Sequence, residues 1–320
     1  MNTSSQEQWP QILRQEMSKV LIGQEELVDS LLLSLLTQGH VLLEGAPGLA
    51  KTLAIKTLSE CLDVSFSRLQ FTPDLLPADL IGTLIYNPEK HTFEPKLGPI
   101  FSQFILADEI NRAPAKVQSA LLEAMQEKQV TLGETTHQLP RPFLVLATQN
   151  PIDQEGTYPL PEAQLDRFLF KIIINYPSME EEMVILEKMS TSAPPEQVQP
   201  VVSVEQLAES RKAVDNIHID KNLNQYIVQL VQATRDLSKI SPELGQLVRA
   251  GASPRASIQL ALSAKALAYL EGRDYVIPQD IKKLAHRILR HRILLSYEAE
   301  AQDISADQVI TSLLSKIQLP

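Results

Sequence analysis

A loop of small residues constrains this chain more than any other feature of its sequence. The loop GAPGLAKT, at positions 45–52, follows the apolar run 41–43 and precedes an amphipathic helical pattern. This order of strand, loop and helix lets successive backbone N–H groups point inward beside the positive end of the helix. Such a cradle binds phosphate groups. The chain is therefore predicted to bind a nucleoside triphosphate.

Two side chains at the end of the loop complete this predicted site. Lys51 supplies a positive charge for the phosphates, and Thr52 offers a hydroxyl ligand to Mg²⁺. Ala50 stands where the motif has its second glycine, so we expect a backbone φ suited to alanine there rather than a left-handed turn. The residues of this segment predicted to contact the nucleotide are Gly45, Ala46, Pro47, Gly48, Leu49, Ala50, Lys51, Thr52 and Leu53.

Further candidate residues follow two other apolar runs. Asp108 and Glu109 follow the run 104–107, and we expect Asp108 to reach the Mg²⁺ shell while Glu109 activates the water that attacks the γ-phosphorus. A carboxylate pair at this place also suits a helix N-terminus, and both interpretations hold together. Asn150 follows the run 143–147, where its amide is placed to hold the attacking water. Alone, an asparagine there would indicate only a turn.

Composition narrows the class of protein. A chain of 320 residues exceeds the usual size of one core, so we expect two domains. The formal charge of −10 gives no general attraction to nucleic acid. No apolar run approaches the roughly 20 residues of a membrane span, and residues 1–8 lack the order of an export signal. These observations predict a cytoplasmic protein, with Cys61 as a buried small hydrophobe.

The chain divides into two parts by its pattern of elements. Residues 1–177 alternate apolar strands with helices, which predicts an α/β core with a parallel sheet covered on both faces. After residue 177 only helical spacing is found, so residues 178–320 are predicted to form a helical domain. Helix starts are expected after Ser178, Ser203 and Ser253, which stand at N-cap positions.

Polar turns between short apolar runs predict hairpins at 84–94 and 129–139. They would either act on a client protein or pack subunits together, and both roles remain open. The basic cluster in 286–292 is interpreted as a solvated helix face, because it lacks the interleaved aromatic residues that stack on bases. His40 and His91 have no partner at metal-ligand spacing, so no zinc site is assigned.

The order of these pieces resembles the MoxR family of AAA+ ATPases, within the helix-2-insert branch that also holds magnesium chelatase and the MCM helicases. The resemblance spans most of the chain. The motifs that carry it are IGQ at 22–24, GAPGLAKT at 45–52, QFTPDLLPADLIG at 70–82, DEINRAP at 108–114, ATQNP at 147–151, LPEAQLDRF at 160–168 and GASPR at 251–255.

This resemblance implies further roles. Ile22 and Gly23 would lie near the adenine, and Asn150 would be the first sensor. Arg167 would be a finger donated to a neighbouring subunit, and Arg255 the second sensor, donated by the lid. The alternative for Arg167 is a surface ion pair with Asp166 or Glu162. Its place just before 168–170, which we expect to be a buried strand, favours a rigidly held charge instead.

The predicted fold is a P-loop AAA+ core, with a parallel five-stranded sheet flanked by helices, followed by a smaller all-α lid. The predicted activity is ATP hydrolysis with Mg²⁺ by a homo-oligomeric ring of six subunits. The resemblance implies chaperone-like maturation or remodelling of protein clients, often with a partner that carries a von Willebrand factor A domain. A DNA-associated motor is the alternative, disfavoured by the acidic charge. A nucleotide switch without efficient turnover is disfavoured by Glu109.

Overall fold

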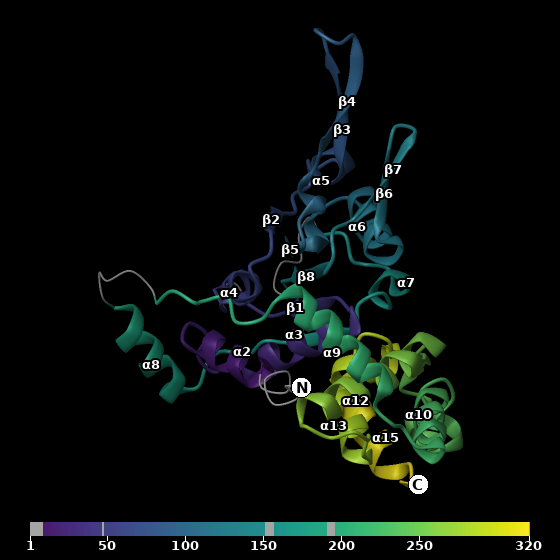
Figure 1. Ribbon diagram of the computed structural model, residues 1–320. Helices are drawn as coiled ribbons and strands as arrows, with labels where there is room; N and C mark the ends of the chain where they lie inside the picture. The colour runs from purple at the N-terminus through teal and green to yellow at the C-terminus, as the bar shows by residue number, and fades with distance from the viewer. Residues whose placement is uncertain (1–8, 47, 151–156, 191–195, 320) are drawn as a thin grey trace. The chain divides into compact units, whose positions relative to one another are not determined.

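The computed structural model describes residues 9–46, 48–150, 157–190 and 196–319 (Figure 1). These residues form two compact units. The first comprises the described residues within 1–160 and 172–207, and the second those within 161–171 and 208–320. The units alternate along the chain, and the predicted domain boundary at residue 177 stays a prediction.

Most of the secondary-structure elements among the described residues are helices. The α-helices are α2 (Trp9–Ser18), α3 (Glu25–Thr37), α4 (Lys51–Leu62), α5 (Pro77–Ile81), α6 (Ala115–Glu127), α7 (Glu162–Leu165), α8 (Met179–Met189), α9 (Val204–Asn216), α10 (Lys221–Ala233), α11 (Pro242–Gly245), α12 (Pro254–Leu270), α13 (Pro278–Leu289), α14 (Tyr297–Ala301) and α15 (Ala306–Lys316). Short 3₁₀ turns are η1 (Pro99–Phe101), η2 (Ile110–Arg112) and η3 (Leu237–Lys239). Among the described residues, no helix has the length and apolar character needed to cross a membrane.

The strands form one larger sheet and three small ones. They are β1 (Val41–Glu44), β2 (Phe66–Gln70), β3 (Gly82–Asn87), β4 (Thr92–Leu97), β5 (Phe104–Asp108), β6 (Gln129–Leu132), β7 (Thr135–Gln138), β8 (Leu144–Gln149), β9 (Phe170–Ile173), β10 (Val248–Ala250) and β11 (Leu294–Leu295). The larger sheet has the order β2-β5-β8-β1-β9, which confirms the predicted five-stranded sheet.

The register of the larger sheet fixes where the site lies. Strand β8 pairs in parallel with β5, where Phe104 faces Leu144, and with β1, where Val41 faces Leu146. All three strands are apolar and almost wholly buried between helices. Their carboxyl ends therefore meet at one edge of the sheet, where ligands of open α/β sheets bind. Cys61 of α4 is buried nearby in the core, as its pattern predicted.

Two expectations about strands are wrong. The predicted strand 168–170 begins two residues later, as β9, although Phe168 and Leu169 are buried as expected. Burial alone does not separate a strand from a turn that anchors apolar side chains in the core. The second unit also contains the antiparallel pair β10 and β11, where only helices were predicted. These strands have three and two residues, too short for a period of two to be recognised in the sequence.

Helix starts follow the predicted caps. The Ser178 hydroxyl accepts a hydrogen bond from the Glu181 N–H at 3.2 Å, and the Glu181 carboxylate accepts one from the Ser178 N–H at 2.7 Å. In the second unit, the Ser253 hydroxyl accepts from the Arg255 N–H at 3.2 Å and Pro254 occupies the first turn of α12. These bonds satisfy N–H groups that the first turn of a helix leaves unpaired.

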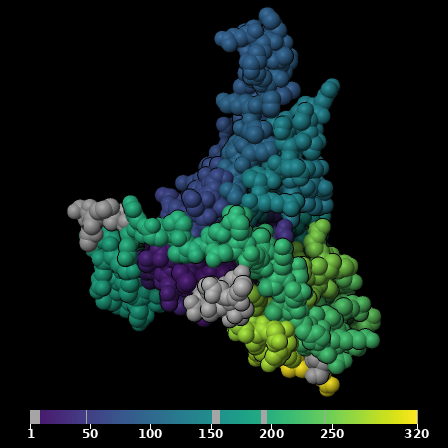
Figure 2. Space-filling view, viewed as in Figure 1, coloured from purple at the N-terminus to yellow at the C-terminus, as the bar shows by residue number. Residues whose placement is uncertain are grey.

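Both predicted hairpins are present, as β3–β4 and β6–β7. The β3–β4 hairpin extends away from the rest of the first unit (Figure 2). One of its faces is apolar, and Leu84, Tyr86 and Phe93 on that face are 40%, 47% and 67% exposed. Gly133, in the turn between β6 and β7, lies against the Leu84 side chain of β3. The turn of the β6–β7 hairpin therefore supports the base of the β3–β4 hairpin. The face is available to a client or to a neighbouring subunit, so both predicted roles remain open.

His40 joins a helix to the sheet inside the first unit. Its Nδ1 accepts a hydrogen bond from the Val145 N–H at 3.0 Å, and its Nε2 lies 3.3 Å from the Met125 carbonyl oxygen. A carbonyl only accepts, so the proton is on Nε2 and the ring is neutral. Burial lowers the pKa of His40 from 6.5 to about 4. The imidazole is therefore a neutral tie between α6 and β8.

This tie predicts a pH dependence of stability. Below pH 6.5 the unfolded chain binds a proton at His40, whereas the folded chain does not until about pH 4. Stability that is present above pH 6.5 is therefore lost as the pH falls towards 4, by about 2 kcal/mol between pH 7.5 and pH 5. Between these pH values, the free energy of unfolding measured with urea should change by about 2 kcal/mol less in His40→Gln than in the parent protein. Equal pH dependence in both proteins would contradict the assignment.

Candidate functional site

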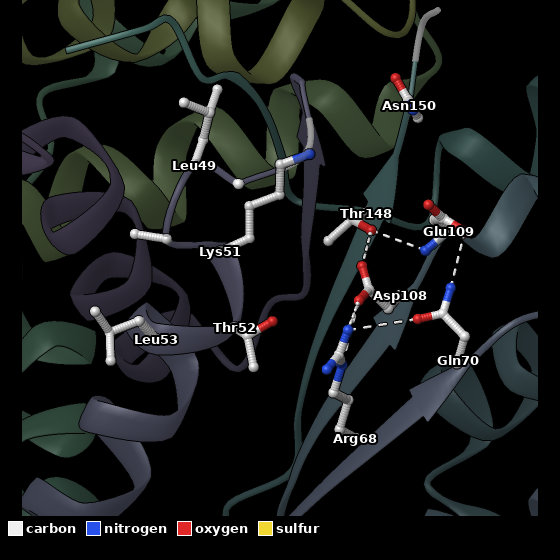
Figure 3. A pocket seen from close by; sticks show the side chains of 12 residues that line it. Leu49, Lys51, Thr52, Leu53, Arg68, Gln70, Asp108, Glu109, Thr148 and Asn150 are labelled. Atoms are coloured by element: carbon white, nitrogen blue, oxygen red, sulfur yellow. Dashed lines mark hydrogen bonds and ion pairs between the residues drawn. The ribbon is translucent and has the colours of Figure 1, made fainter. Parts of the chain in front are cut away.

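A pocket of about 360 Å³ lies at the carboxyl edge of the sheet, within the first unit (Figure 3). The phosphate-binding loop and the start of α4 form one side, and the ends of β2, β5 and β8 form the other. The lining residues are Gly48, Leu49, Ala50, Lys51, Thr52, Leu53, Arg68, Gln70, Asp108, Glu109, Thr148 and Asn150. Six predicted loop residues are thus brought together with Asp108, Glu109 and Asn150.

The backbone of the loop corrects one expectation. Ala50 has φ 53° and ψ 18°, a left-handed conformation, whereas a φ suited to alanine was predicted. This turn leads directly into α4, which starts at the next residue, Lys51, and whose first residues line the pocket. Gly48 is also left-handed, with φ 84°. Of the other predicted loop residues, Gly45 and Ala46 are described outside the pocket lining, and Pro47 lies outside the described residues.

Lys51 folds back over the loop. Its Nζ donates a hydrogen bond to the carbonyl oxygen of Gly45. Burial lowers the pKa of Lys51, while the negative charges of Asp108 and Glu109 oppose that shift. The ammonium group is thus held beside the loop at one end of the pocket, facing the two carboxylates across it.

A threonine that sequence analysis did not single out organises the acidic side of the pocket. The Thr148 hydroxyl donates to Asp108 Oδ1 at 2.7 Å and accepts from the Glu109 N–H at 2.8 Å. Thr148 is 1% exposed. This buried hydroxyl fixes the Asp108 side chain and the left-handed backbone of Glu109, which has φ 56°. Its signal in the sequence is weak, because a threonine suits any strand end.

Two residues of β2 also hold the carboxylates. Arg68 donates to Asp108 Oδ2 from Nη2 at 2.6 Å and from Nε at 3.2 Å. Gln70 donates to Glu109 Oε2 at 2.8 Å, and Arg112 donates to the same oxygen at 3.1 Å. Neither Arg68 nor Gln70 was given a role from the sequence, in which no strand was predicted at 66–70.

The residues predicted near the adenine line a different cavity. Ile22 and Gly23 border a space of about 660 Å³ between α2, the start of α3 and α8, all in the first unit. Gly23 has φ +67°, and the carboxylate of Glu181 lies so close that a Cβ at residue 23 would be 2.2 Å from Oε1. Any other residue would be strained at this φ and would have to displace the Glu181 carboxylate.

The second unit carries both predicted arginines, Arg167 and Arg255. The two acids proposed as surface partners of Arg167, Glu162 and Asp166, each accept a hydrogen bond from another arginine. Glu162 accepts from Arg249 at 2.6 Å, and Asp166 accepts from Arg255 at 3.1 Å. The acids offered as surface partners of Arg167 thus have arginine partners of their own. The pocket residues and these two arginines belong to different compact units.

The interpretation of the basic cluster in 286–292 as a solvated face is wrong for residues 290–292, whereas His286 and Arg287 are half-buried. His291 and Arg292 are each 5% exposed, and the side chain of Arg290 is 12% exposed. Arg290 donates to the Lys171 carbonyl at 3.2 Å, and Arg292 donates to Asp166 Oδ1 at 2.7 Å. Arg290 and Arg292 are buried because they pair with another segment of the second unit, which helical spacing alone does not reveal.

Sequence models of two protein families match the chain. One, described as the ATPase family associated with various cellular activities (AAA), matches residues 40–170. The other, described as an AAA lid domain, matches residues 245–313. The first match covers the phosphate-binding loop, the carboxylate pair and Arg167, and the second covers Arg255.

Three similar proteins span nearly the whole chain. Chaperone MoxR1 of Mycobacterium tuberculosis is 49% identical over 95% of this chain and 81% of its own length. The uncharacterized protein YeaC of Bacillus subtilis is 45% identical over 96% of this chain and 93% of its own. The crystal structure of a candidate ATPase from Cytophaga hutchinsonii matches with a TM-score of 0.93 and 52% identity, over 98% of this chain and 96% of that one.

The left-handed turn at Ala50 predicts a gain in stability. Glycine adopts φ 53° without the steric cost that a Cβ adds, so Ala50→Gly should stabilise the nucleotide-free protein by about 0.5 to 1 kcal/mol. Ala54→Gly, inside α4, should instead destabilise it by about 1 kcal/mol. Urea unfolding measures both. A loss of stability in Ala50→Gly equal to that in Ala54→Gly would show that the methyl group at residue 50 contributes packing.

Proposed function

Because this chain belongs to the MoxR family of AAA+ ATPases, we propose that it hydrolyses ATP at the pocket of the first unit, with help from an arginine of a neighbouring subunit. The observation that carries the proposal is the opposition of charges across that pocket. Lys51 and the N-terminus of α4 face Asp108 and Glu109, which the Thr148 hydroxyl holds in place. A triphosphate with its metal ion suits a pocket with one cationic and one anionic side.

The loop provides the binding step. Its backbone N–H groups and the first turn of α4 would bind the phosphates, with Lys51 exchanging the Gly45 carbonyl for a phosphate oxygen. The exchange replaces a neutral acceptor with a charged one, so it favours the bound state. Ile22 and Gly23 would contact the adenine from their cavity beside α3.

The donor set fits Mg²⁺. The Thr52 hydroxyl and the Asp108 carboxylate are hard oxygen ligands lining the same pocket. When bound there, the ion supplies positive charge to the β- and γ-phosphate oxygens. Arg68 now pairs with Asp108 Oδ2 and must release that oxygen before it can serve as a ligand.

Glu109 would act as the general base. It takes a proton from the attacking water while the water oxygen bonds to the γ-phosphorus and the bond to the β–γ bridging oxygen breaks, giving ADP and phosphate. Gln70 and Arg112 both donate to Oε2 and thereby orient the carboxylate. Asn150, at the end of β8 in the same pocket, would hold the water.

Arginines would neutralise the charge that develops in the transition state. We assign Arg167 as the finger that a neighbouring subunit donates and Arg255 as the second sensor. Arg255 would exchange Asp166 for a phosphate oxygen when nucleotide binds.

The family resemblance implies a homo-oligomeric ring of six subunits. The ring would act in the cytoplasm on protein clients, with a partner that carries a von Willebrand factor A domain. The acidic charge of −10 does not favour nucleic acid as a partner.

Substitution of Glu109 tests the chemical step. Glu109→Gln keeps the shape but removes the base, so ATP should still bind while turnover falls by about 10²- to 10⁴-fold. Glu123→Gln, on the exposed side of α6, is the matched control and should keep full turnover. Steady-state hydrolysis and calorimetric ATP binding measure the two effects. Undiminished turnover in Glu109→Gln would refute the assignment.

Substitution of Arg167 tests the shared site. Arg167→Ala should bind ATP normally yet lose roughly 10³-fold or more in turnover. When mixed with Glu109→Gln subunits, it should regain some hydrolysis, because mixed rings contain interfaces that pair an intact Glu109 with an intact Arg167. Labelled subunits report whether mixed rings form. If they form and no activity returns at any ratio, Arg167 does not act on a neighbour's site.

A further inference from the structure

The segment that carries Arg167 is held by a buried arginine far away in the sequence. Arg292 follows α13, and its guanidinium reaches both sides of residue 167. It donates to the Asp166 carboxylate at 2.7 Å, to the Asp166 carbonyl at 3.1 Å and to the Leu169 carbonyl at 3.4 Å, and it also bonds to the Phe168 carbonyl. Residues 166, 168 and 169 are therefore all fixed to one side chain.

Arg292 is buried, and its hydrogen bonds all go to groups inside the second unit. Its side chain is 1% exposed, and its remaining hydrogen bonds go to the Ile288 carbonyl and to Gln259. Burial lowers its pKa to about 10, while the Asp166 carboxylate acts in the opposite direction. An arginine this deeply buried requires nearly complete pairing, which the 166–169 segment supplies.

The Asp166 carboxylate ties the same segment to α12. While Oδ1 accepts from Arg292, Oδ2 accepts from the Ser253 hydroxyl at 2.9 Å and from Arg255 at 3.1 Å. Ser253 caps α12, so the turn that carries Arg167 is braced by two elements, the end of α13 and the start of α12.

We propose that Arg292 is a positioning residue for Arg167: it fixes the backbone on both sides of the finger, so that the guanidinium of Arg167 is presented in one geometry to the neighbouring subunit. The proposal rests on the finger role assigned to Arg167 above. Transition-state stabilisation by a charge depends steeply on placement, and a shift of about 1 Å can cost roughly 10²-fold in rate. A flexible turn at 166–169 would lose that advantage.

Lysine at residue 292 separates charge from geometry. Arg292→Lys keeps a positive charge beside Asp166, but a single ammonium group cannot bond to three carbonyls and a carboxylate at once. We expect ATP affinity to be unchanged and turnover to fall by about 10²-fold, less than in Arg167→Ala.

Mixing experiments distinguish positioning from a general loss of structure. Arg292→Lys subunits have an intact Glu109 and a misplaced finger, so mixing with Glu109→Gln subunits should restore hydrolysis. Mixing with Arg167→Ala subunits should restore none, because neither partner offers a working finger. A subunit that is merely misfolded would give no recovery in either mixture.

Two further variants keep the test decisive. Arg273→Lys is the matched control, since Arg273 is another arginine of the second unit, with side-chain exposure of 19% and partners Glu271, Tyr275 and Asp280. It should keep parental turnover. If Arg292→Lys fails to fold by circular dichroism, Asp166→Asn takes its place, because it weakens the same anchor while keeping the shape of the side chain. It should show the same pattern of recovery.

The outcomes separate this proposal from the one on which it depends. Recovery with Glu109→Gln and none with Arg167→Ala supports the positioning role. If Arg167→Ala shows the finger behaviour but Arg292→Lys or Asp166→Asn keeps full turnover, or shows no recovery in established mixed rings, the positioning role is wrong. If Arg167→Ala itself keeps full turnover, the finger assignment fails first.

Discussion

The Thr148 hydroxyl is the interaction on which the candidate site depends. It lies at the end of β8, and the parallel register places it beside Asp108 at the end of β5. By donating to Asp108 and accepting from the Glu109 N–H, one buried group fixes the Asp108 carboxylate and the backbone from which the Glu109 side chain extends. A parallel sheet provides such a place because its strands end together at one edge, where backbone groups are free to turn towards a ligand.

The arginines of the second unit show a different use of charge. Arg292 is buried with a full set of partners, whereas Arg255 and, in the first unit, Arg68 are half-exposed and each pairs with a single carboxylate. A buried pair is costly to break, while an exposed pair is worth little and exchanges readily. Arg292 therefore suits a fixed scaffold, and Arg255 and Arg68 suit exchange for a phosphate or release of a ligand.

Most of the correct predictions came from local patterns in the sequence. The parallel sheet, the two hairpins and the caps at Ser178 and Ser253 follow from apolar period, turn residues and cap residues that lie close together in sequence, whereas the count of five strands came from the family resemblance. Asp108, Glu109 and Lys51 were brought to one pocket as expected, because the loop and strand ends that carry them are recognisable motifs.

The failures concern backbone geometry and distant partners. The left-handed φ of Ala50 was missed because its residue type argues against it. Arg68 and Asp108 are 40 residues apart, and Arg292 and Asp166 are 126 apart, so no local pattern relates them. The cluster in 286–292 looked solvated for the same reason: the partners of its buried residues, which include Asp166 and the carbonyls of Phe168 and Lys171, lie in a distant segment.

We propose that hydrolysis requires two subunits, since the arginine finger is assigned to a neighbour of the subunit that carries the pocket. The most direct test measures ATPase activity per subunit during dilution through the concentration at which sedimentation shows the assembly to dissociate. The account predicts that activity per subunit falls steeply towards zero as subunits separate, while separated subunits still bind ATP. Constant activity per subunit in fully dissociated protein would contradict it.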